Sequence, residues 1–281
     1  NRTTNSSQFA TAHDAEFIKT FRRENRPYDK FVRDLLTTDG AVWDSGAVGY
    51  YLRDRGMPLD NMSNTVRVFL GTRLECAQCH DHPFDKWTQM DYFQMAAFSY
   101  EMQSNYRAPI MQDLQGFVRG GGSRELGRIS RQEQAAMRNA LQEVMRPLRY
   151  TAIQRQDQTL RLPDDYKYDN GKPRQPVTAK TMFGPDAEPN LDAYAAWLTS
   201  KDNPRFTTVI ANRLWKEVFG IGLIEPVDEI TDQTVASNPE LMNFLEQRMK
   251  EFDYDLKAFL RVLYNTKAYQ REATRSEILA G

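Results

Sequence analysis

The sequence is poor in cysteine and histidine, with two cysteines and three histidines among its 281 residues. A framework of several disulfides is therefore excluded, as are multi-haem arrangements and catalytic sites built from many imidazoles. An excess of one charge is also missing, because 37 Lys and Arg face 38 Asp and Glu, for a net charge of -1. This balance gives no reason to expect nucleic acid or an anionic membrane as a partner.

Long hydrophobic runs are missing as well. The apolar stretches at 193–198 and 95–98 are among the longest, whereas a helix that crosses a bilayer needs about 20 apolar residues. We therefore expect no membrane span in this chain. The polar residues 1–7 do not look like a signal peptide, but the sequence opens without Met, so this observation says nothing about export.

Both cysteines belong to one motif, Cys76-Ala-Gln-Cys79-His80, which has the C-x-x-C-H spacing of covalent haem attachment. Each thiol can add to one vinyl group of the porphyrin, since side chains three residues apart on a helical turn lie on one face. The adjoining His80 can then bind the iron as the proximal ligand. The motif predicts one covalently bound haem c per chain, with His80 as the metal ligand.

Three other interpretations of the cysteine pair stay open. A redox dithiol usually opens a helix that follows a strand, whereas here residues 64–75 are predicted to form an amphipathic helix that leads into the motif. A zinc site needs four ligands, and structural zinc usually draws them from two separated pairs. The third interpretation is a structural disulfide. The possible zinc ligands are Cys76, Cys79, His80 and His82.

His82 is not expected to bind the same iron as His80. Axial ligands stand on opposite faces of the porphyrin, and the short link through Asp81 cannot pass around the ring. His82 is expected instead to contact a haem propionate, to support a ligand from behind or to shape the turn that follows it. The distal position is left open, because it can also be vacant or hold water. Candidate distal ligands are His13, Met90 and Met95.

The rest of the chain is predicted to be mainly α, as two helical parts with little strand. The segment 163–189 carries five of the thirteen prolines and is predicted to be an extended linker between these parts. A short strand is predicted at 158–162, and a glycine-rich loop at 116–129. Helices are expected at 15–23, 28–36, 64–75, 130–145, 191–198, 206–219, 239–252 and 256–264, and after the capping box that begins at Thr88.

Two stretches resemble known families. Val68-Phe-Leu-Gly71, followed by Cys76-Ala-Gln-Cys79-His80-Asp-His-Pro-Phe-Asp85, resembles the cytochrome-named domain of unknown function of planctomycetes (PSCyt type). Asn203-Pro-Arg-Phe206 and Asn212-Arg-Leu-Trp215 resemble the planctomycete-specific domain (PSD type) that usually follows it. The resemblance implies a first domain at 1–162, the linker at 163–189 and a second domain at 190–281, which looks incomplete.

The resemblance also implies an exported protein with a c-type haem. It adds Asp81, His82, Phe84 and Asp85 to the cofactor site. It further adds Arg213 and Trp215 from the second domain. A buried arginine beside a propionate is a sensible electrostatic arrangement, but the Asn-Arg-x-Trp sequence can equally brace the interface between the two domains.

The leading hypothesis for function is a mono-haem c-type cytochrome-like protein. It would transfer electrons to or from a redox partner protein outside the cytoplasm, in the periplasm or at the cell surface, where bacteria attach haem c. One alternative is a haem enzyme of peroxidase type with an open distal site. Another is a structural or interaction module whose cysteine pair binds zinc or forms a disulfide.

Overall fold

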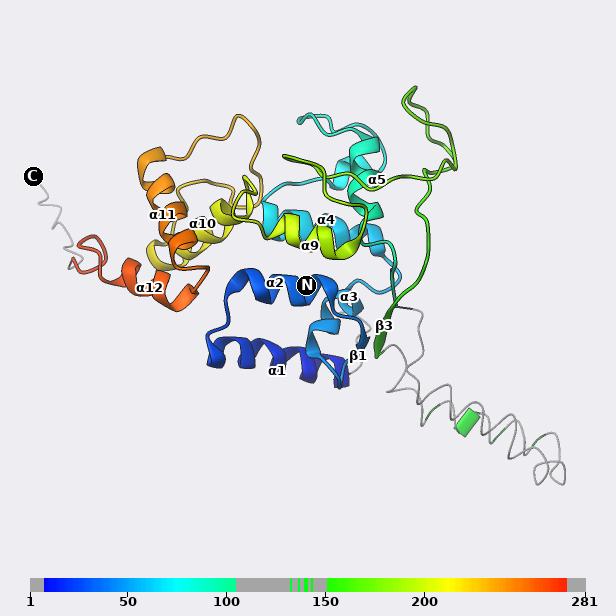
Figure 1. The fold of residues 1–281 in the computed structure, drawn as a ribbon, viewed down its shortest axis with the longest axis horizontal. Coiled ribbons are helices and arrows are strands. Elements are labelled where there is room, and N and C mark those ends of the chain that lie inside the picture. Colours follow the sequence, from blue (N-terminus) through cyan, green and yellow to red (C-terminus); the bar gives the residue numbers. More distant parts are fainter. Residues whose placement is uncertain are drawn as a thin grey trace, which may run out of the picture.

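The computed structural model describes residues 8–104 and 151–271, together with isolated positions between 132 and 143. The loop expected at 116–129 and most of the helix expected at 130–145 lie outside the described residues. Within the described ranges the chain forms nine α-helices and three strands of two to four residues (Figure 1). The prediction of a mainly α fold with little strand is confirmed.

The first part of the chain is built on amphipathic helices. In the second of them, Val32, Leu35 and Leu36 form the buried stripe that helical spacing predicts. The helix expected at 64–75 instead begins at Pro58. Proline has no backbone N–H, but the N–H groups of a first helical turn have no partner within the helix, so none is lost there. The helices are α1 (Gln8–Glu24), α2 (Tyr28–Thr37), α3 (Gly49–Arg53), α4 (Pro58–Leu70) and α5 (Gln89–Ala97).

Gly71 ends α4, five residues before the first cysteine. Its φ of 61° is left-handed, and a Cβ atom there would come within 2.8 Å of Val209 and 2.9 Å of Ile230. A side chain at this position would therefore clash with the second part of the molecule. The prediction that helix 64–75 runs directly into the motif is wrong at this point, because the chain leaves the helix at Gly71.

The capping box predicted at the start of α5 is confirmed. Thr88 Oγ1 accepts a hydrogen bond from Asp91 N at 3.1 Å, and Asp91 Oδ2 accepts one from Thr88 N at 2.9 Å. This reciprocal pair satisfies two amides of the first turn and fixes where the helix begins. The helix then buries Tyr92, Phe93 and Met95 in the core.

A small antiparallel sheet joins distant segments of the chain. Its strands are β1 (Gly40–Ala41), β2 (Met102–Gln103) and β3 (Ala152–Arg155), with β3 in the centre. The strand predicted at 158–162 is not formed, since that segment makes only an isolated bridge between Arg161 and Pro176. The strand that forms instead, β3, begins with the apolar residues Ala152 and Ile153, and both are buried.

The second part contains four helices, three of which have the predicted bounds, while the helix expected at 239–252 ends one residue earlier. They are α9 (Leu191–Leu198), α10 (Phe206–Phe219), α11 (Pro239–Glu251) and α12 (Leu256–Tyr264). Side chains of Asn190, Asn238 and Asp255 accept hydrogen bonds from the first turns of α9, α11 and α12. Helix α10 packs against α11 and α12 and also against α4 of the first part.

One hydrophobic core contains residues from both parts. Helix α9 packs on α2 (Figure 1), and Arg33 Nε donates to Thr199 Oγ1 at 2.6 Å between them. The segment 163–189 forms no helix or regular strand, yet Tyr166 and Val177 are buried in the same core. Its expected role as a spacer between two separate parts is not confirmed, because it packs against both of them.

Candidate functional site

The C-x-x-C-H motif lies on one short turn. A 3-10 helix spans Glu75–Gln78, and both Cys79 N and His80 N lie 3.3 Å from the carbonyl oxygen of Cys76. Cys76 lies within this helix, and Cys79 is its C-cap residue. Both cysteines are free and exposed. The predicted placement of the two thiols on one turn is therefore confirmed.

The opposite face of this turn is fixed in the core. Leu74 and Ala77 have no exposed surface. Gln89, on the first turn of α5, donates from its side chain to the carbonyl oxygen of Gln78 at 2.9 Å. The turn is thus anchored in the core on its inner side, while both cysteines are exposed.

The Tyr92 side chain of α5 contacts both α4 and the motif turn. Its hydroxyl lies 3.0 Å from the Leu59 carbonyl, 3.0 Å from Ser63 Oγ and 3.3 Å from Gln78 Oε1. Burial raises the pKa of Tyr92 well above its ordinary value, so the side chain stays a neutral hydroxyl. Helices α4 and α5 and the motif turn are therefore held to one another by this group.

The His80 imidazole is exposed and has a defined tautomer. Its Nδ1 lies 2.7 Å from the carbonyl oxygen of Asp81. A carbonyl oxygen only accepts hydrogen bonds, so Nδ1 carries a proton, and in the neutral ring Nε2 keeps its lone pair. Metal-binding histidines characteristically donate their other N–H in this way. His80 Nε2 makes no hydrogen bond to any of the described residues.

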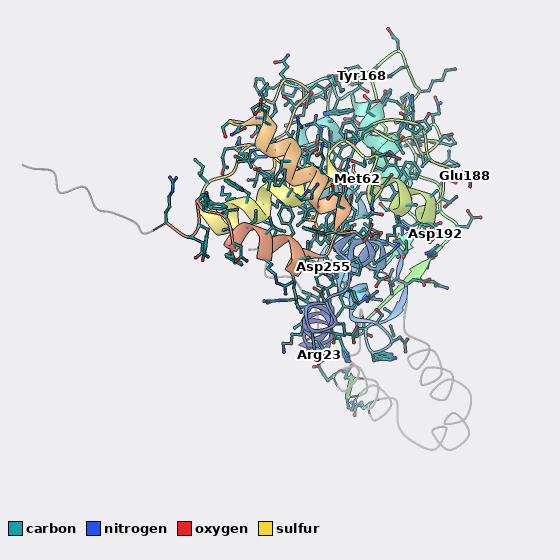
Figure 2. All side chains as sticks on the ribbon, turned by 60° about the vertical axis from the view of Figure 1, so that its left-hand side comes forward. Arg23, Met62, Tyr168, Glu188, Asp192 and Asp255 are labelled. Carbon is teal, nitrogen blue, oxygen red and sulfur yellow. The ribbon has the colours of Figure 1, made fainter. Side chains whose placement is uncertain are left out.

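Asp81 is itself held on both sides. Its amide donates to the Tyr168 hydroxyl at 2.8 Å, and its carboxylate accepts from Gln89 N at 2.8 Å. Tyr168 belongs to the 163–189 segment and lies at the upper edge of the molecule in Figure 2. The carbonyl that orients His80 is therefore part of a fixed backbone.

His82 has the opposite tautomer. Its Nδ1 accepts a hydrogen bond from Phe84 N at 3.2 Å, so the proton of the neutral ring is on Nε2. The His82 amide also donates to the Trp87 carbonyl at 2.8 Å, which closes the 82–87 loop. These contacts favour the turn-shaping role among the three expected for His82.

A pocket of about 490 Å³ lies beside Cys76. His82 and Phe84 line it from the motif loop, and residues 229–231 line it from the second part. Phe84 is 91% exposed at this pocket. Its lining carries both charges, with Arg67 and Arg73 facing the acidic residues Glu75, Asp85 and Glu229 of the same pocket. A loop of the second part that the sequence did not indicate therefore lines the pocket beside Cys76.

A second pocket, of about 590 Å³, lies beside Cys79. Met57, Leu59, Phe93 and Leu160 give it apolar lining. Asp60, Arg161 and Asp165 add charged groups. The two cysteines therefore open onto different pockets, so the turn that carries them has free space on either side.

Ion pairs tie the motif region to the loop 228–232. Arg73 contacts Asp228 at 3.0 Å, and the hydrogen bond to Asp228 raises the pKa of Arg73. Asp232 accepts from Lys86 and, at 3.1 Å, from Arg205. The Lys86 contact, followed by the Arg205 charge, lowers the pKa of Asp232. Exposed pairs of this kind contribute up to about 1 kcal/mol each, so they position the loop more than they stabilise it.

Arg213 lies at the C-terminal end of α4. Its guanidinium donates to the Val68 carbonyl at 2.6 Å and to the Arg67 carbonyl at 3.4 Å. The last carbonyls of a helix lack partners within the helix and carry partial negative charge, so a cation there is favourable. Of the two roles considered for Arg213 in the sequence analysis, these contacts correspond to the brace between the two domains. Arg213 lines neither pocket, and its contact with a propionate stays a prediction.

Trp215 packs on its own helix. Its ring stacks on Phe219 with centroids 4.0 Å apart, and Phe219 in turn meets Tyr269 edge-on. Trp215 lines neither of the pockets beside the cysteines. Its place in the cofactor site also stays a prediction, without a supporting contact.

The neighbour of Arg213, Asn212, has a role that the sequence did not reveal. It is fully buried, accepts from Leu223 N at 2.8 Å and Ile224 N at 3.1 Å, and donates to the Ile224 carbonyl at 2.8 Å. One amide side chain thus satisfies three backbone groups of the 220–225 loop. The two neighbouring residues of α10 therefore hold different segments, since Asn212 binds the 220–225 loop and Arg213 binds the end of α4.

The donor set at the motif fits covalent haem attachment. Two accessible thiols lie three residues apart on one turn, and the adjacent imidazole has an unprotonated Nε2 when the ring is neutral. A closed zinc site fits less well, because among the described residues no three His, Cys, Asp or Glu side chains converge to hold a metal ion. In the same described ranges, no helix has the length and apolar character to cross a bilayer.

The distal candidates are placed differently from one another. His13 is on α1, which packs against the 3-10 turn Gly46–Val48 and α3. Met95 is 1% exposed in the core. Met90 is half-buried, and its Cε would be 2.8 Å from a Cβ atom at Gly171. None of the three lines the pocket beside Cys76 or the pocket beside Cys79.

The fold and the site define a mainly α protein with an exposed C-x-x-C-H turn between two pockets. Residues 3–104 match the family model described as PSCyt2, protein of unknown function (DUF1549), and residues 191–280 match PSD1, protein of unknown function (DUF1553). The two matches occur in the order that the sequence suggested, which confirms the resemblance. No curated protein and no solved structure matches it.

Proposed function

We propose that this chain is a mono-haem c-type cytochrome-like protein that transfers electrons outside the cytoplasm, in the periplasm or at the cell surface. One haem c would be attached through Cys76 and Cys79, with His80 as the proximal ligand. The observation that carries the proposal is the His80 tautomer. The Asp81 carbonyl holds the proton on Nδ1 and leaves Nε2 available, directly beside two exposed thiols.

The residues around the motif would orient the cofactor and control access to it. A bound haem supplies a one-electron iron couple whose potential depends on ligands, hydrogen bonds and burial. The Asp81 carbonyl fixes the plane of the His80 ring, and Tyr168 and Gln89 fix Asp81. The exposed Phe84 at the pocket edge offers an apolar contact for a redox partner protein.

Among the described residues that line the two pockets, the haem-enzyme alternative finds no free distal imidazole, which leaves only carboxylates as a distal acid or base. Peroxidase-type chemistry requires such a group on the open side of the iron. Of the three histidines, two belong to the motif loop, and His13 lines neither pocket. The arrangement favours electron transfer over this alternative.

The proposal is tested by producing the protein with a c-type haem maturation system and extracting it with acid-acetone. The wild-type chain is expected to retain a Soret band, because thioether bonds survive this extraction. A Cys76→Ser/Cys79→Ser variant should lose the band, whereas His82→Ala, which keeps the attachment residues, should retain it. A colourless wild-type protein would contradict the proposal, and bound zinc in its place would support the structural module.

A further inference from the structure

We propose that the exposed face of α12, together with the turn that follows it, binds an acidic polysaccharide. The stretch 256–271 contains four basic residues and no Asp or Glu. All four are exposed, and none of them forms an ion pair with any of the described residues. They are Lys257, Arg261, Lys267 and Arg271. Uncompensated positive charge gathered on one surface attracts a polyanion.

This surface is separate from the C-x-x-C-H motif. Figure 1 shows α12 at the left-hand end of the molecule, whereas α5, which packs on the motif turn, lies in the right-hand half. The inference therefore goes beyond the proposed haem function and does not rest on it.

Two tyrosines lie among the cations. Lys257, Arg261 and Tyr264 are spaced i, i+4 and i+7, so they share one face of α12. Tyr264 is 40% exposed and Tyr269 is 45% exposed, and their ring centroids are 4.9 Å apart. The surface thus presents aromatic rings directly beside positive charge.

The tyrosines are held in place before any ligand binds. Tyr269 N donates to Thr266 Oγ1 at 3.3 Å, and Gln270 N donates to the Thr266 carbonyl at 3.0 Å. The Tyr269 ring also meets Phe219 edge-on at 6.2 Å, and Phe219 stacks on Trp215. A surface that is already ordered loses less entropy on binding. Trp215 therefore supports this surface from α10.

Two amide side chains narrow the class of polyanion. Asn265 Nδ2 donates to the Arg261 carbonyl at 2.7 Å, and Gln270 Nε2 donates to the Tyr264 carbonyl at 2.6 Å. Their amide oxygens accept no hydrogen bond from the described residues, so they can accept from a ligand. Sugar hydroxyls supply such donors, whereas the carboxylates of an acidic protein and the phosphates of DNA only accept. The apolar C–H face of a sugar ring also packs on a tyrosine ring.

An anionic membrane fits this surface less well. A helix that lies on a bilayer inserts its apolar face between the lipids. In α12 the apolar face contains Phe259 and Leu263, which are both buried in the protein core. The exposed face has charge and tyrosine rings to offer, and these match a hydrated, ring-containing polyanion.

The test measures the binding of polygalacturonate to the full chain by isothermal titration calorimetry. The fully methyl-esterified polymer, which has the same rings without the charge, should bind much more weakly. Arg261→Gln/Lys267→Gln should weaken binding roughly tenfold, as expected when two cations leave a surface that faces an anionic one. Arg22→Gln/Lys172→Gln removes the same charge from exposed positions elsewhere and should bind like the wild type.

The contribution of the rings is measured separately. Tyr264→Ala/Tyr269→Ala keeps the net charge and should also weaken binding. Polyacrylate and oligothymidylate, which are polyanions without the sugar hydroxyls of a polysaccharide, should bind the wild-type chain more weakly than polygalacturonate. Circular dichroism checks the fold of each variant, and the comparison of ligands on the wild-type chain needs no variant.

The inference is overturned if polygalacturonate does not bind, or if Arg261→Gln/Lys267→Gln or Tyr264→Ala/Tyr269→Ala keeps wild-type affinity. Equal or tighter binding of the methyl ester, polyacrylate or oligothymidylate also overturns it, and for oligothymidylate it would indicate a nucleic-acid surface. A colourless protein that binds polygalacturonate in the expected manner would contradict the haem proposal and leave this inference intact.

Discussion

The Nδ1 atom of His80 lies 2.7 Å from the carbonyl oxygen of Asp81, and this contact decides which nitrogen of the ring can bind a metal. His82, two residues later, accepts a hydrogen bond at Nδ1 instead. The neighbouring imidazoles therefore have opposite tautomers. Only His80 combines a free Nε2 with a position directly next to Cys79.

Replacing His80 tests its role as a ligand and not as a structural residue. His80→Ala is expected to change the free energy of unfolding by less than about 0.5 kcal/mol, because the side chain is exposed. In haem-loaded protein the same change should alter the axial ligation, seen as a shift of the Soret band. His82→Ala is the control and should leave the ligation unchanged. Identical spectra for His80→Ala and wild type would contradict the assignment.

Arg213 is predicted to stabilise the contact between the two parts without affecting the haem. Arg213→Met removes hydrogen bonds from a charged group to the last turn of α4 and should cost about 1.5–3 kcal/mol. Urea unfolding measures this loss, and the pyridine haemochrome should remain at wild-type stoichiometry. If Arg213→Met loses haem while its free energy of unfolding is unchanged, Arg213 belongs to the cofactor site and does not brace the interface.

Asn212 is expected to be more critical for folding than its exposed counterpart Asn190. Asn212→Ala leaves two amides and one carbonyl of the 223–224 backbone buried without partners, at a cost of about 3 kcal/mol or more. Asn190→Ala removes only a helix cap and should cost about 1 kcal/mol. Thermal unfolding compares the two, and equal losses would contradict the account of the 220–225 loop.

Asp232 gives the motif loop a pH-dependent contact. Contact with Lys86 and Arg205 lowers the pKa of Asp232 from 3.8, so its contribution to stability is present above this value. That contribution is lost as the pH falls through the lower folded-state pKa. Asp232→Asn should therefore reduce stability at neutral pH, by less than about 1 kcal/mol for an exposed pair.

The same variant should match the wild-type chain at a pH well below 3.8. High salt should also reduce the difference at neutral pH, because it screens exposed charges. Urea unfolding over a pH series measures both effects. A deficit that does not change with pH would show that Asp232 acts through packing and not through its charge.

Local sequence patterns predicted much of the fold. The spacing of Val32, Leu35 and Leu36 predicted the buried stripe of α2, and Thr88 with Asp91 predicted the start of α5. The C-x-x-C-H spacing predicted that both cysteines lie on one turn. Each of these features depends on residues within one or two helical turns, so a single sequence contains the information.

Features that depend on distant residues were missed. The prediction of helix 64–75 ignored Gly71, whose left-handed conformation is required by contacts with Val209 and Ile230 far along the chain. The pairing of Arg73 with Asp228 depends on the same packing. The 163–189 segment has the composition of a linker, yet Tyr166 and Val177 are drawn into the common core.

Intact-mass spectrometry of the acid-acetone-extracted protein tests covalent haem attachment most directly. The protein should be produced with a c-type haem maturation system, and the Cys76→Ser/Cys79→Ser variant should be measured in parallel. We predict a wild-type mass that exceeds the mass of the polypeptide by one haem, with the addition located on the peptide that contains Cys76 and Cys79. A wild-type mass equal to that of the polypeptide alone would contradict the account.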